Sequence, residues 1–421
     1  MLFKAHELAT AMCPAGWTRV RLAEIAQEVS VRAGHDTALP VLSVTKHRGI
    51  VKAEDYFSKA VHGRDTSNYK IVRSGDFAYA TIHLDEGSLG RHTDTPSGIV
   101  SPMYTVFEVT AGFDPYYLET LLRSPKSIVT YGSLGQGTVN RRASISFSAF
   151  SGLVLQHPPL PEQKKIAAIL SSVDEVIAKT EAVIAQLQIV KKAMMEQLLT
   201  KGMPGRHTRF KQTEIGEIPE EWEVVSLERA ASRIVVGVVI QPASYYVPDG
   251  IPALRSLNVK DDEILLDKLV FFSDASNQQL SKSQIRTGDV LTVRTGVPGV
   301  SACVPAALNG ANCIDLIITT PSAALRGEFL SRFINSDRGR GAILKRQGGL
   351  AQQHFNVGEM KQLLVPIPSI EEQDLIIERL QVIDARLGVE RALAKAITIV
   401  KAALSSSLLS GELRVIPEVA E

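Results

Sequence analysis

Cysteine is scarce in this chain of 421 residues, which argues against a zinc site and against a disulfide-stabilised fold. Cys13, Cys303 and Cys313 lack metal-ligand spacing, and three residues cannot form an even disulfide framework. A Cys303–Cys313 pair stays open, although buried free thiols in a reducing cytosol are the simpler interpretation. The N-terminus lacks the apolar core of a signal peptide, and no run of about 18 apolar residues occurs. We therefore expect a cytoplasmic protein that does not enter a membrane.

An excess of charge of either sign is also missing. The chain has 46 basic against 45 acidic residues, a net charge of +1. This balance does not indicate nucleic-acid binding, but it does not exclude it, because local patches matter more than the sum. The length exceeds one ordinary core, so we expect about two to four domains.

Motifs for catalysis are absent as well. No Walker-type phosphate loop occurs, and we interpret the glycines of 132–137 (GSLGQG) as a loop. The Asn/Asp-Pro-Pro-aromatic motif of amino-methyltransferases is missing, since HPPL at 157–160 does not match it. No His/Cys cluster has zinc-ligand spacing. The sequence therefore indicates a chain without catalytic machinery of its own.

Two groups of polar residues have simpler interpretations than catalysis. His83 and His92 flank a loop with Gly and Asp, but scattered surface or core histidines explain them. Asp261, Asp262 and Glu263 suggest nuclease carboxylates, but no companion lysine occupies a convincing position. We interpret this triplet as a solvated turn.

The chain repeats itself with a period of about half its length, which is the first feature to look for in a long sequence. Five matches keep their order: 17–22 with 222–227, 74–77 with 287–290, 118–124 with 330–336, 135–137 with 347–349, and 159–163 with 368–373. The interiors, roughly 32–70 and 243–285, do not align. The pattern is typical of two copies of one scaffold that are tuned to different targets.

A long helix is predicted after each Pro-rich stretch, over about 161–201 and 370–411. Apolar residues recur at alternating spacings of four and three, which is a heptad seam. The seam residues are Ile166, Leu170, Val173, Ile177, Ile184, Leu187, Met194 and Leu198 in the first helix, and Ile376, Leu380, Ile383, Leu387, Ala394, Ile397, Leu404 and Leu408 in the second. The interruptions match, with Thr180 and Lys191 in the first helix and Glu390 and Lys401 in the second.

Each predicted helix must bury its apolar stripe, and the other copy is the simplest partner. Since each helix follows a domain, we expect antiparallel pairing; the alternative is that each helix packs on its own domain. The segment 202–221, between the first helix and the second domain, contains GMPG, whose Gly and Pro stop the first helix. Ile215 and Ile218 are expected to attach this linker to a surface.

The domains mix short strands with a few helices, so we expect a mixed α/β (α+β) class without a firm topology. Strand candidates are 38–44, 76–82, 103–108 and 152–155 in the first half, and 253–257, 289–294, 312–319 and 362–366 in the second. Helices are expected at 115–123 and 327–335. Both helices lead into basic, Gly-rich loops.

These two basic loops occupy equivalent positions in the repeat and carry the candidate DNA contacts. Arginine and lysine neutralise phosphates, while arginine and amide side chains pair with base edges. The candidates are Arg123, Lys126, Gln136, Arg141 and Arg142 in the first domain, and Arg338, Arg340, Lys345, Arg346, Gln352 and Gln353 in the second. A solvated charged turn is the alternative for each one. We predict that removing the charges of Arg338 and Arg340 weakens DNA binding.

The run from 160 to 203 (LPEQKKIAAILSS…LLTKGM), followed by TEIGEIPEEWEVVSL, closely resembles the central conserved region of specificity (S) subunits of type I restriction–modification systems. PIPSIEEQDLIIERLQVIDARL and SLLSGEL resemble the distal conserved region. With the two Trp-headed domains, the resemblance covers essentially the whole chain.

The resemblance implies two target-recognition domains, each of which reads one half of a bipartite DNA site. It divides the chain into a first recognition domain (1–160), a central spacer helix (161–202), a linker (203–220), a second recognition domain (221–369), a distal spacer helix (370–412) and a tail (413–421). The spacer helices would set the distance between half-sites, about one DNA turn, and dock two methyltransferase (M) subunits. Restriction (R) subunits would complete the complex. This chain would hold no cofactor, because S-adenosylmethionine belongs to the M subunits and ATP with magnesium to the R subunits.

Two alternatives remain open. A fused restriction–methylation enzyme would explain the resemblance, but the missing methyltransferase and nuclease motifs argue against it. A coiled-coil scaffold with two protein-binding domains would explain the near-neutral charge. A DNA-binding assay with genomic fragments separates the scaffold from the DNA reader.

Overall fold

The computed structural model describes residues 13–34, 39–57, 65–110, 112–134, 144–346 and 355–415. The chain forms two compact units, residues 1–180 with 393–421 and residues 181–392. Each unit contains one globular domain and part of both long helices, α6 (Leu160–Lys201) and α12 (Ile370–Ser410). Both helices begin and end within a residue or two of the expected positions.

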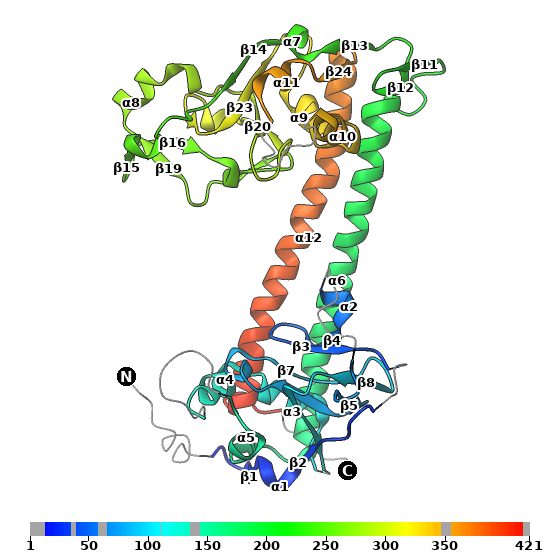
Figure 1. Cartoon of the computed structure of the whole chain (residues 1–421), viewed down its shortest axis with the longest axis vertical. Coiled ribbons are helices and arrows are strands. Elements are labelled where there is room, and N and C mark those ends of the chain that lie inside the picture. The colour runs from blue at the N-terminus through cyan, green and yellow to red at the C-terminus, as the bar shows by residue number, and fades with distance from the viewer. Residues whose placement is uncertain are drawn as a thin grey trace. The chain divides into compact units, whose positions relative to one another are not determined.

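The first unit is built on a four-stranded antiparallel sheet in the order β2-β9-β6-β7 (Figure 1). Its strands are β2 (Ala26–Val29), β9 (Tyr104–Val109), β6 (Phe77–Ala80) and β7 (Leu89–Arg91). Phe77 and Phe107 are cross-strand partners whose rings stack at 5.2 Å. These rings belong to an aromatic core that continues onto both helices, because Ile166 and Leu408 are buried in the same cluster. The domain is thereby anchored to the helices by apolar burial.

Shorter elements complete the first unit. They are β1 (Thr18–Arg21) paired with β10 (Val154–His157), β3 (Leu42–Thr45) with β4 (Gly49–Lys52), β5 (Lys70–Arg73) with β8 (Ser97–Val100), and helices α1 (Leu22–Ile25), α2 (Ala53–Tyr56), α3 (Pro115–Leu122), α4 (Pro125–Tyr131) and α5 (Phe147–Ser151).

The second unit repeats this plan. Its sheet has the order β14-β23-β20-β21, with strands β14 (Ala231–Val236), β23 (Leu316–Pro321), β20 (Val290–Val293) and β21 (Ser301–Cys303). The equivalents of β1 and β10 are β13 (Glu223–Ser226) and β24 (Leu364–Ile367), which pair in the same way. The helices follow in the same sequence, as α7 (Leu227–Ala230), α9 (Gly327–Asn335), α10 (Asp337–Arg346) and α11 (Val357–Lys361). The duplication inferred from sequence is thus present in the topology, and the class is mixed helix and sheet.

The interiors of the two domains differ, as the failed alignment suggested. The second unit has an additional sheet in the order β15-β19-β16-β22, formed by β15 (Tyr246–Val247), β19 (Val270–Phe272), β16 (Ile251–Leu254) and β22 (Asn312–Cys313). It also has α8 (Asp274–Gln279), a hairpin of β17 (Val259–Lys260) with β18 (Glu263–Ile264), and the linker hairpin β11 (Phe210–Thr213) with β12 (Gly216–Pro219). In that linker Ile218 is buried and Ile215 packs against the same core, as expected.

The two long helices run antiparallel within each unit. In the first unit Asp174 of α6 is paired with Lys401 of α12, and Glu162 is paired with Arg414 beyond the end of α12. In the second unit Lys191 lies 2.6 Å from Asp384, while Met203 donates to Glu372. In both units residue numbers rise along one helix as they fall along the other.

The seam residues vary in burial: Ile166, Leu170, Ile376, Leu380, Ile383 and Leu387 are buried, while Val173, Ile177, Ile184, Leu187, Ile397 and Leu404 are partly buried.

A Gln at the start of each long helix fastens the helix to its domain. Gln163 accepts a hydrogen bond from the backbone of Asp114 and donates to Pro158. Gln373 accepts from the backbone of Arg326 and donates to Pro368. Buried amides that satisfy backbone groups in this way are costly to remove. The repeated Pro-x-x-x-Glu-Gln motif, at 158–163 and 368–373, therefore has one structural role in both halves.

Helix α12 corrects one expectation drawn from the sequence. A window of 18 residues within it has a mean hydropathy of 1.5, so by length and composition alone it is apolar enough to cross a membrane. The expectation considered only unbroken apolar runs, whereas this helix carries apolar residues on several sides. Leu393, Ile399 and Val400 are exposed by 46%, 61% and 60%. Protein-contacting helices pass the same test, so the finding is weak evidence for a membrane.

Candidate nucleic-acid interface

The basic segment of the first domain follows α3. Arg123 donates to the backbone oxygen of His47 at 3.0 Å and lies 3.6 Å from Glu119, so its guanidinium is engaged within the domain. Lys126, on α4, has an exposed side chain. The predicted contacts Gln136, Arg141 and Arg142 lie outside the described residues.

The basic segment of the second domain is α10. Arg338 donates to the backbone oxygen of Ile215 at 2.9 Å and to Glu196 of α6 at 3.2 Å. Arg340 is paired with Asp261. Lys345 is exposed near the end of α10. The side chain of Arg346, and both Gln352 and Gln353, lie outside the described residues.

These contacts divide the predicted DNA-binding residues into two kinds. Arg338 and Arg340 each have an acidic partner within the chain, so a DNA phosphate would have to compete with that carboxylate. Arg338 in addition holds the linker hairpin, where the backbone at Gly216 leaves no room for a Cβ beside the guanidinium. Lys126 and Lys345 are exposed and are therefore the better placed to neutralise phosphates.

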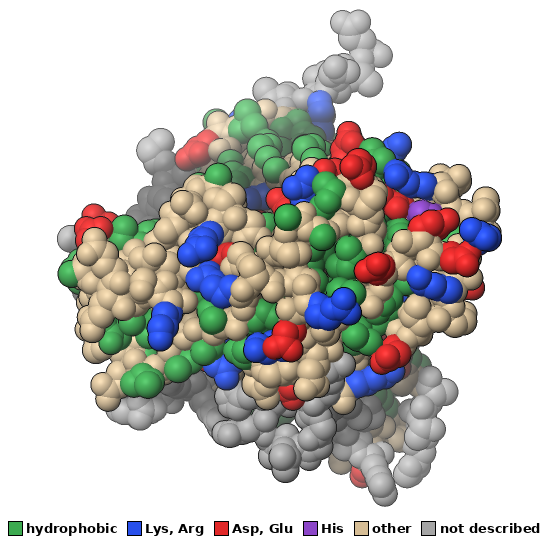
Figure 2. All heavy atoms as spheres, turned by 90° about the horizontal axis from the view of Figure 1, so that it is seen from above, with side chains coloured by type: hydrophobic (Ala, Val, Ile, Leu, Met, Phe, Trp, Pro, Cys, Tyr) green, Lys and Arg blue, Asp and Glu red, His purple; other side chains and the backbone are tan. Residues whose placement is uncertain are grey.

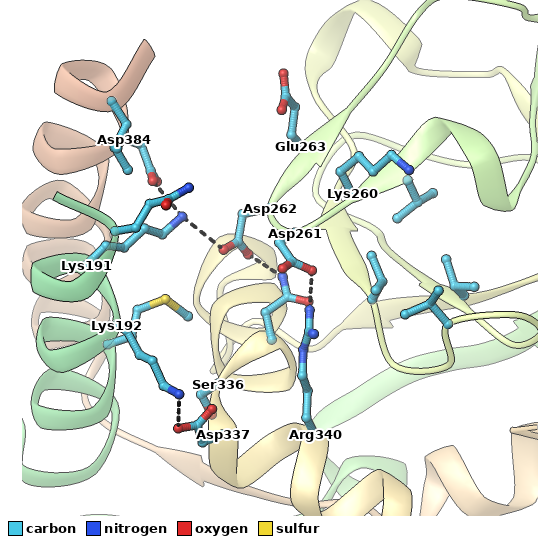
Figure 3. Close-up of a pocket in the computed structure, with 18 of the residues that line it drawn as sticks. Lys191, Lys192, Lys260, Asp261, Asp262, Glu263, Ser336, Asp337, Arg340 and Asp384 are labelled. Carbon is cyan, nitrogen blue, oxygen red and sulfur yellow. Dashed lines mark hydrogen bonds and ion pairs between the residues drawn. The ribbon is translucent and has the colours of Figure 1, made fainter. Parts of the chain in front are cut away.

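The described residues enclose a cavity in each unit, at equivalent places. In the second unit a cavity of about 1230 Å³ lies between α6, α12 and the domain, and Lys191, Asp384 and Ser336 line it (Figure 3). In the first unit a cavity of about 820 Å³ is lined by Lys401, Asp174 and Ser124. In the repeat, Lys191 corresponds to Lys401, Asp384 to Asp174 and Ser336 to Ser124. The duplicated scaffold thus places an equivalent hollow in each unit, where the domain meets the helices.

Asp262, on the wall of the larger cavity, is not the solvated turn expected from the sequence. Its side chain is only 9% exposed, and one carboxylate oxygen accepts hydrogen bonds from Ser331 at 2.6 Å and Asn335 at 2.8 Å. Burial raises the pKa of Asp262, while the nearby Arg332 opposes that rise. The predicted turn is present, with Asp261 and Glu263 exposed, but Asp262 is not solvated because Ser331 and Asn335 of α9 cover its side chain.

Charge is mixed on the surface as well. On the face shown in Figure 2, basic and acidic side chains are interspersed and are not gathered by sign. This agrees with the net charge of +1. No broad field of one sign on this face would draw in a polyanion, so DNA contacts would have to come from a few local cations.

Comparison with known proteins agrees with this architecture. Residues 49–188 match the family model described as the type I restriction modification DNA specificity domain. The chain is 27% identical over 361 residues to a Methanocaldococcus jannaschii protein named as the MjaX type I restriction enzyme specificity subunit, covering 83% of this chain and 81% of that protein. It is 28% identical over 316 residues to the MjaVIII specificity subunit of the same organism, covering 72% and 71%.

The matched family model and these relatives support the assignment of this chain as a specificity subunit of a type I restriction–modification system. A solved chain from work on complex assembly in the type I R-M system has the same fold, with a TM-score of 0.58 at 18% identity over 96% of this chain and 100% of that one. Specificity subunits are non-catalytic, as expected for this sequence. Among the described residues of the subunit, no group of three or more His, Cys, Asp or Glu side chains is arranged to hold a metal ion.

The sequence missed several residues of the specificity subunit that line the larger cavity. Lys260, next to Asp261, has an exposed side chain, and Val297 is 62% exposed on the loop between β20 and β21. The Gly-Val-Pro-Gly of 296–299 was the available signal, since such a sequence favours an exposed turn. The cysteines agree with expectation: Cys303 and Cys313 are free, and burial raises the pKa of Cys303 to about 12.

Proposed function

We propose that this specificity subunit reads a bipartite DNA site, with one recognition domain on each half-site. The observation that carries the proposal is the duplicated sheet order, β2-β9-β6-β7 and β14-β23-β20-β21, combined with dissimilar interiors. A repeated scaffold gives two domains the same attachment to the helices, whereas different interiors give them different targets. We divide the chain functionally as 1–160 and 221–369 for the recognition domains, with spacer helices at 161–202 and 370–412.

The same proposal assigns the spacer helices a second role, the docking of two methyltransferase subunits. In the second unit Val183 and Val190 of α6 lie seven residues apart, on the same side of the helix, and are exposed by 42% and 38%. Their equivalents in the first unit, Leu393 and Val400 of α12, are exposed by 46% and 60%. Contiguous exposed apolar surface marks interaction sites, and helices recognise such faces at heptad spacing. Two equivalent faces suit two copies of one partner.

Partner subunits supply the chemistry in this proposal. The methyltransferase subunits bind S-adenosylmethionine and methylate adenine, and the restriction subunits use ATP and magnesium. The complex acts on double-stranded DNA in the cytoplasm. The specificity subunit contributes recognition and geometry only.

Methylation mapping of a host tests the proposal. One strain expresses the chain with its neighbouring methyltransferase, and the control strain lacks the chain. We expect a new split motif with methyladenine in both halves. An unchanged methylation pattern despite a folded complex would contradict DNA reading and would favour a protein-binding scaffold.

The DNA-contact residues are tested separately on the assembled complex. Lys345→Gln should weaken binding to all sequences alike and lower the salt dependence of log Kd by about one, because one phosphate contact is lost. Arg338→Gln serves as a comparison, since it removes contacts to Glu196 and to the linker hairpin. We expect Arg338→Gln to lower the free energy of unfolding. If Lys345→Gln leaves both affinity and salt slope unchanged, its assignment as a phosphate contact is wrong.

A further inference from the structure

A cluster of four charged side chains joins the second recognition domain to both spacer helices. Lys191 of α6 lies 2.6 Å from Asp384 of α12, and Arg332 of α9 donates to the other oxygen of Asp384 at 2.8 Å. Asp262, in the turn between β17 and β18, lies 3.8 Å from Arg332 and 4.0 Å from Lys191. Figure 3 shows Lys191 directed at both carboxylates. Lys191, Asp384, Arg332 and Asp262 are called the clamp below.

Two side chains of the clamp are buried, and the other two, Lys191 and Asp384, are 20% and 30% exposed, less than those of the ordinary ion pair beside them. The side chains of Arg332 and Asp262 are 7% and 9% exposed. Those of the neighbouring Lys192–Asp337 pair are 71% and 65% exposed. Desolvated charges add little net stability, but moving one away from its partners is costly. A buried cluster therefore specifies one arrangement of the elements that carry it.

The position of Asp262 makes the cluster sensitive to displacement. One carboxylate oxygen is held by Ser331 and Asn335, which belong to the same domain. The other oxygen has no hydrogen-bond partner and faces the cations of Arg332 and Lys191. A shift of the domain along α6 would change the distance from this oxygen to Lys191 while its domain contacts stay fixed. The charge interaction thus depends on where the domain sits on the helices.

The first unit has a related but simpler arrangement. Asp174 of α6 is paired with Lys401 of α12, at the positions that correspond to Asp384 and Lys191. The domain contributes the neutral hydroxyl of Tyr116, which donates to Asp174. The helix part of the cluster is therefore common to both halves, whereas the domain part differs. Among the described residues, the second domain contributes the buried charges of Arg332 and Asp262 at this junction, where the first contributes a neutral hydroxyl.

We propose that the clamp fixes the orientation of the second recognition domain on the spacer helices, and so determines how strictly the distance between the two DNA half-sites is enforced. The inference rests on the proposed function. It goes further by assigning spacer discrimination to named side chains at the domain–helix junction, in addition to helix length. Lys191, Asp384, Arg332 and Asp262 act as positioning residues and do not touch DNA.

Asp384→Asn in the assembled methyltransferase complex provides the test, because it removes the charge with little change in shape. Binding is measured on duplexes with the native spacer and with one base pair more or fewer. We expect the preference for the native spacer to fall by about tenfold or more. Affinity for duplexes with a single half-site should stay unchanged, since neither reading surface is altered.

A matched control and a second variant make the result decisive. Lys192→Met removes an exposed ion pair one residue away and should leave spacer preference intact. Asp262→Asn keeps an oxygen for Ser331 but turns an amide toward two cations, and should relax the preference as Asp384→Asn does. Circular dichroism and thermal melting establish that each complex is folded.

Three outcomes would overturn the inference. These are an unchanged spacer preference in folded Asp384→Asn and Asp262→Asn, an equal loss in Lys192→Met, or a failure of both clamp variants to fold, which would show a purely structural role. A wild-type complex that ignores the second half-site altogether gives a different signature. That result refutes the proposed bipartite function, and the role of the clamp with it.

Discussion

Glu372 is a buried carboxylate at the start of α12, and its removal is expected to destabilise the second unit strongly. The side chain is 2% exposed and accepts hydrogen bonds from Trp222 Nε1 at 3.0 Å, His207 Nε2 at 2.8 Å and the Met203 backbone at 3.0 Å. Glu372→Ala leaves three donors without a partner, each of which costs about 1–3 kcal/mol if it stays dry. Allowing for partial rehydration, we expect a loss of about 3–5 kcal/mol, the range for breaking a buried charged network.

The chain supplies its own control in Glu162, the equivalent residue of the first unit. Glu162 is also buried, but its donors, the Arg414 guanidinium and the Val415 backbone, belong to partly exposed residues that regain water when the carboxylate is removed. The equivalent indole nitrogen, that of Trp17, has no hydrogen-bond partner to lose. Glu162→Ala should therefore cost about 1 kcal/mol.

Urea unfolding followed by tryptophan fluorescence measures both effects. The chain has two tryptophans, and one lies beside each glutamate, so each unit has a reporter of its own. Glu372→Ala should lower the midpoint reported by Trp222 far more than Glu162→Ala lowers that reported by Trp17. Equal losses of stability in the two variants, or a larger loss for Glu162→Ala, would refute the argument that the number of buried donors determines the free-energy cost of removing the carboxylate.

Three further predictions concern single residues. Gly388→Ala should raise the free energy of unfolding by about 1 kcal/mol, because the glycine is inside a helix and an added Cβ meets nothing within 4 Å; calorimetry that shows a lower Tm would contradict this. Gly202→Ala should lower the free energy of unfolding by about 1–2 kcal/mol, because φ at Gly202 is +73° and the added Cβ would lie 2.6 Å from Glu372. An unchanged urea midpoint would contradict this prediction. Burial raises the pKa of Asp262 above 3.8, so its favourable contribution is complete below that pH and is lost as pH rises through the folded-state pKa. The stability of the wild type relative to Asp262→Asn should therefore fall from acidic to neutral pH in urea titrations, and a pH-independent difference would show that the group does not titrate as inferred.

Periodic features were predictable from the sequence alone. The heptad spacing and the Pro-rich starts located α6 and α12. The order of five short matches revealed the duplication, which the sheet orders then displayed. The helix predicted at 327–335 coincides with α9. Such features depend on neighbours in sequence, so a linear pattern carries the necessary information.

Charged residues were harder to interpret, because their role depends on partners far away in the chain. Arg338 was expected at a DNA surface, yet it contacts Glu196, which is 142 residues distant in sequence. Asp262 was expected in solvent, yet it is buried beside Arg332. The net charge of a sequence does not indicate which of its cations are already paired with carboxylates inside the folded chain.

The sequence by itself determined the family, the two-fold repeat, the extent of the long helices and the absence of recognisable catalytic motifs, because each of these is written in local periodicity or in short motifs. Only the tertiary structure decided that the sheets are antiparallel in the order β2-β9-β6-β7 and its copy, and that Lys191, Asp384, Arg332 and Asp262 meet at one point. The reason is physical: strand pairing and the desolvation of charge depend on which distant segments come into contact, and that is settled when the chain buries its apolar surface.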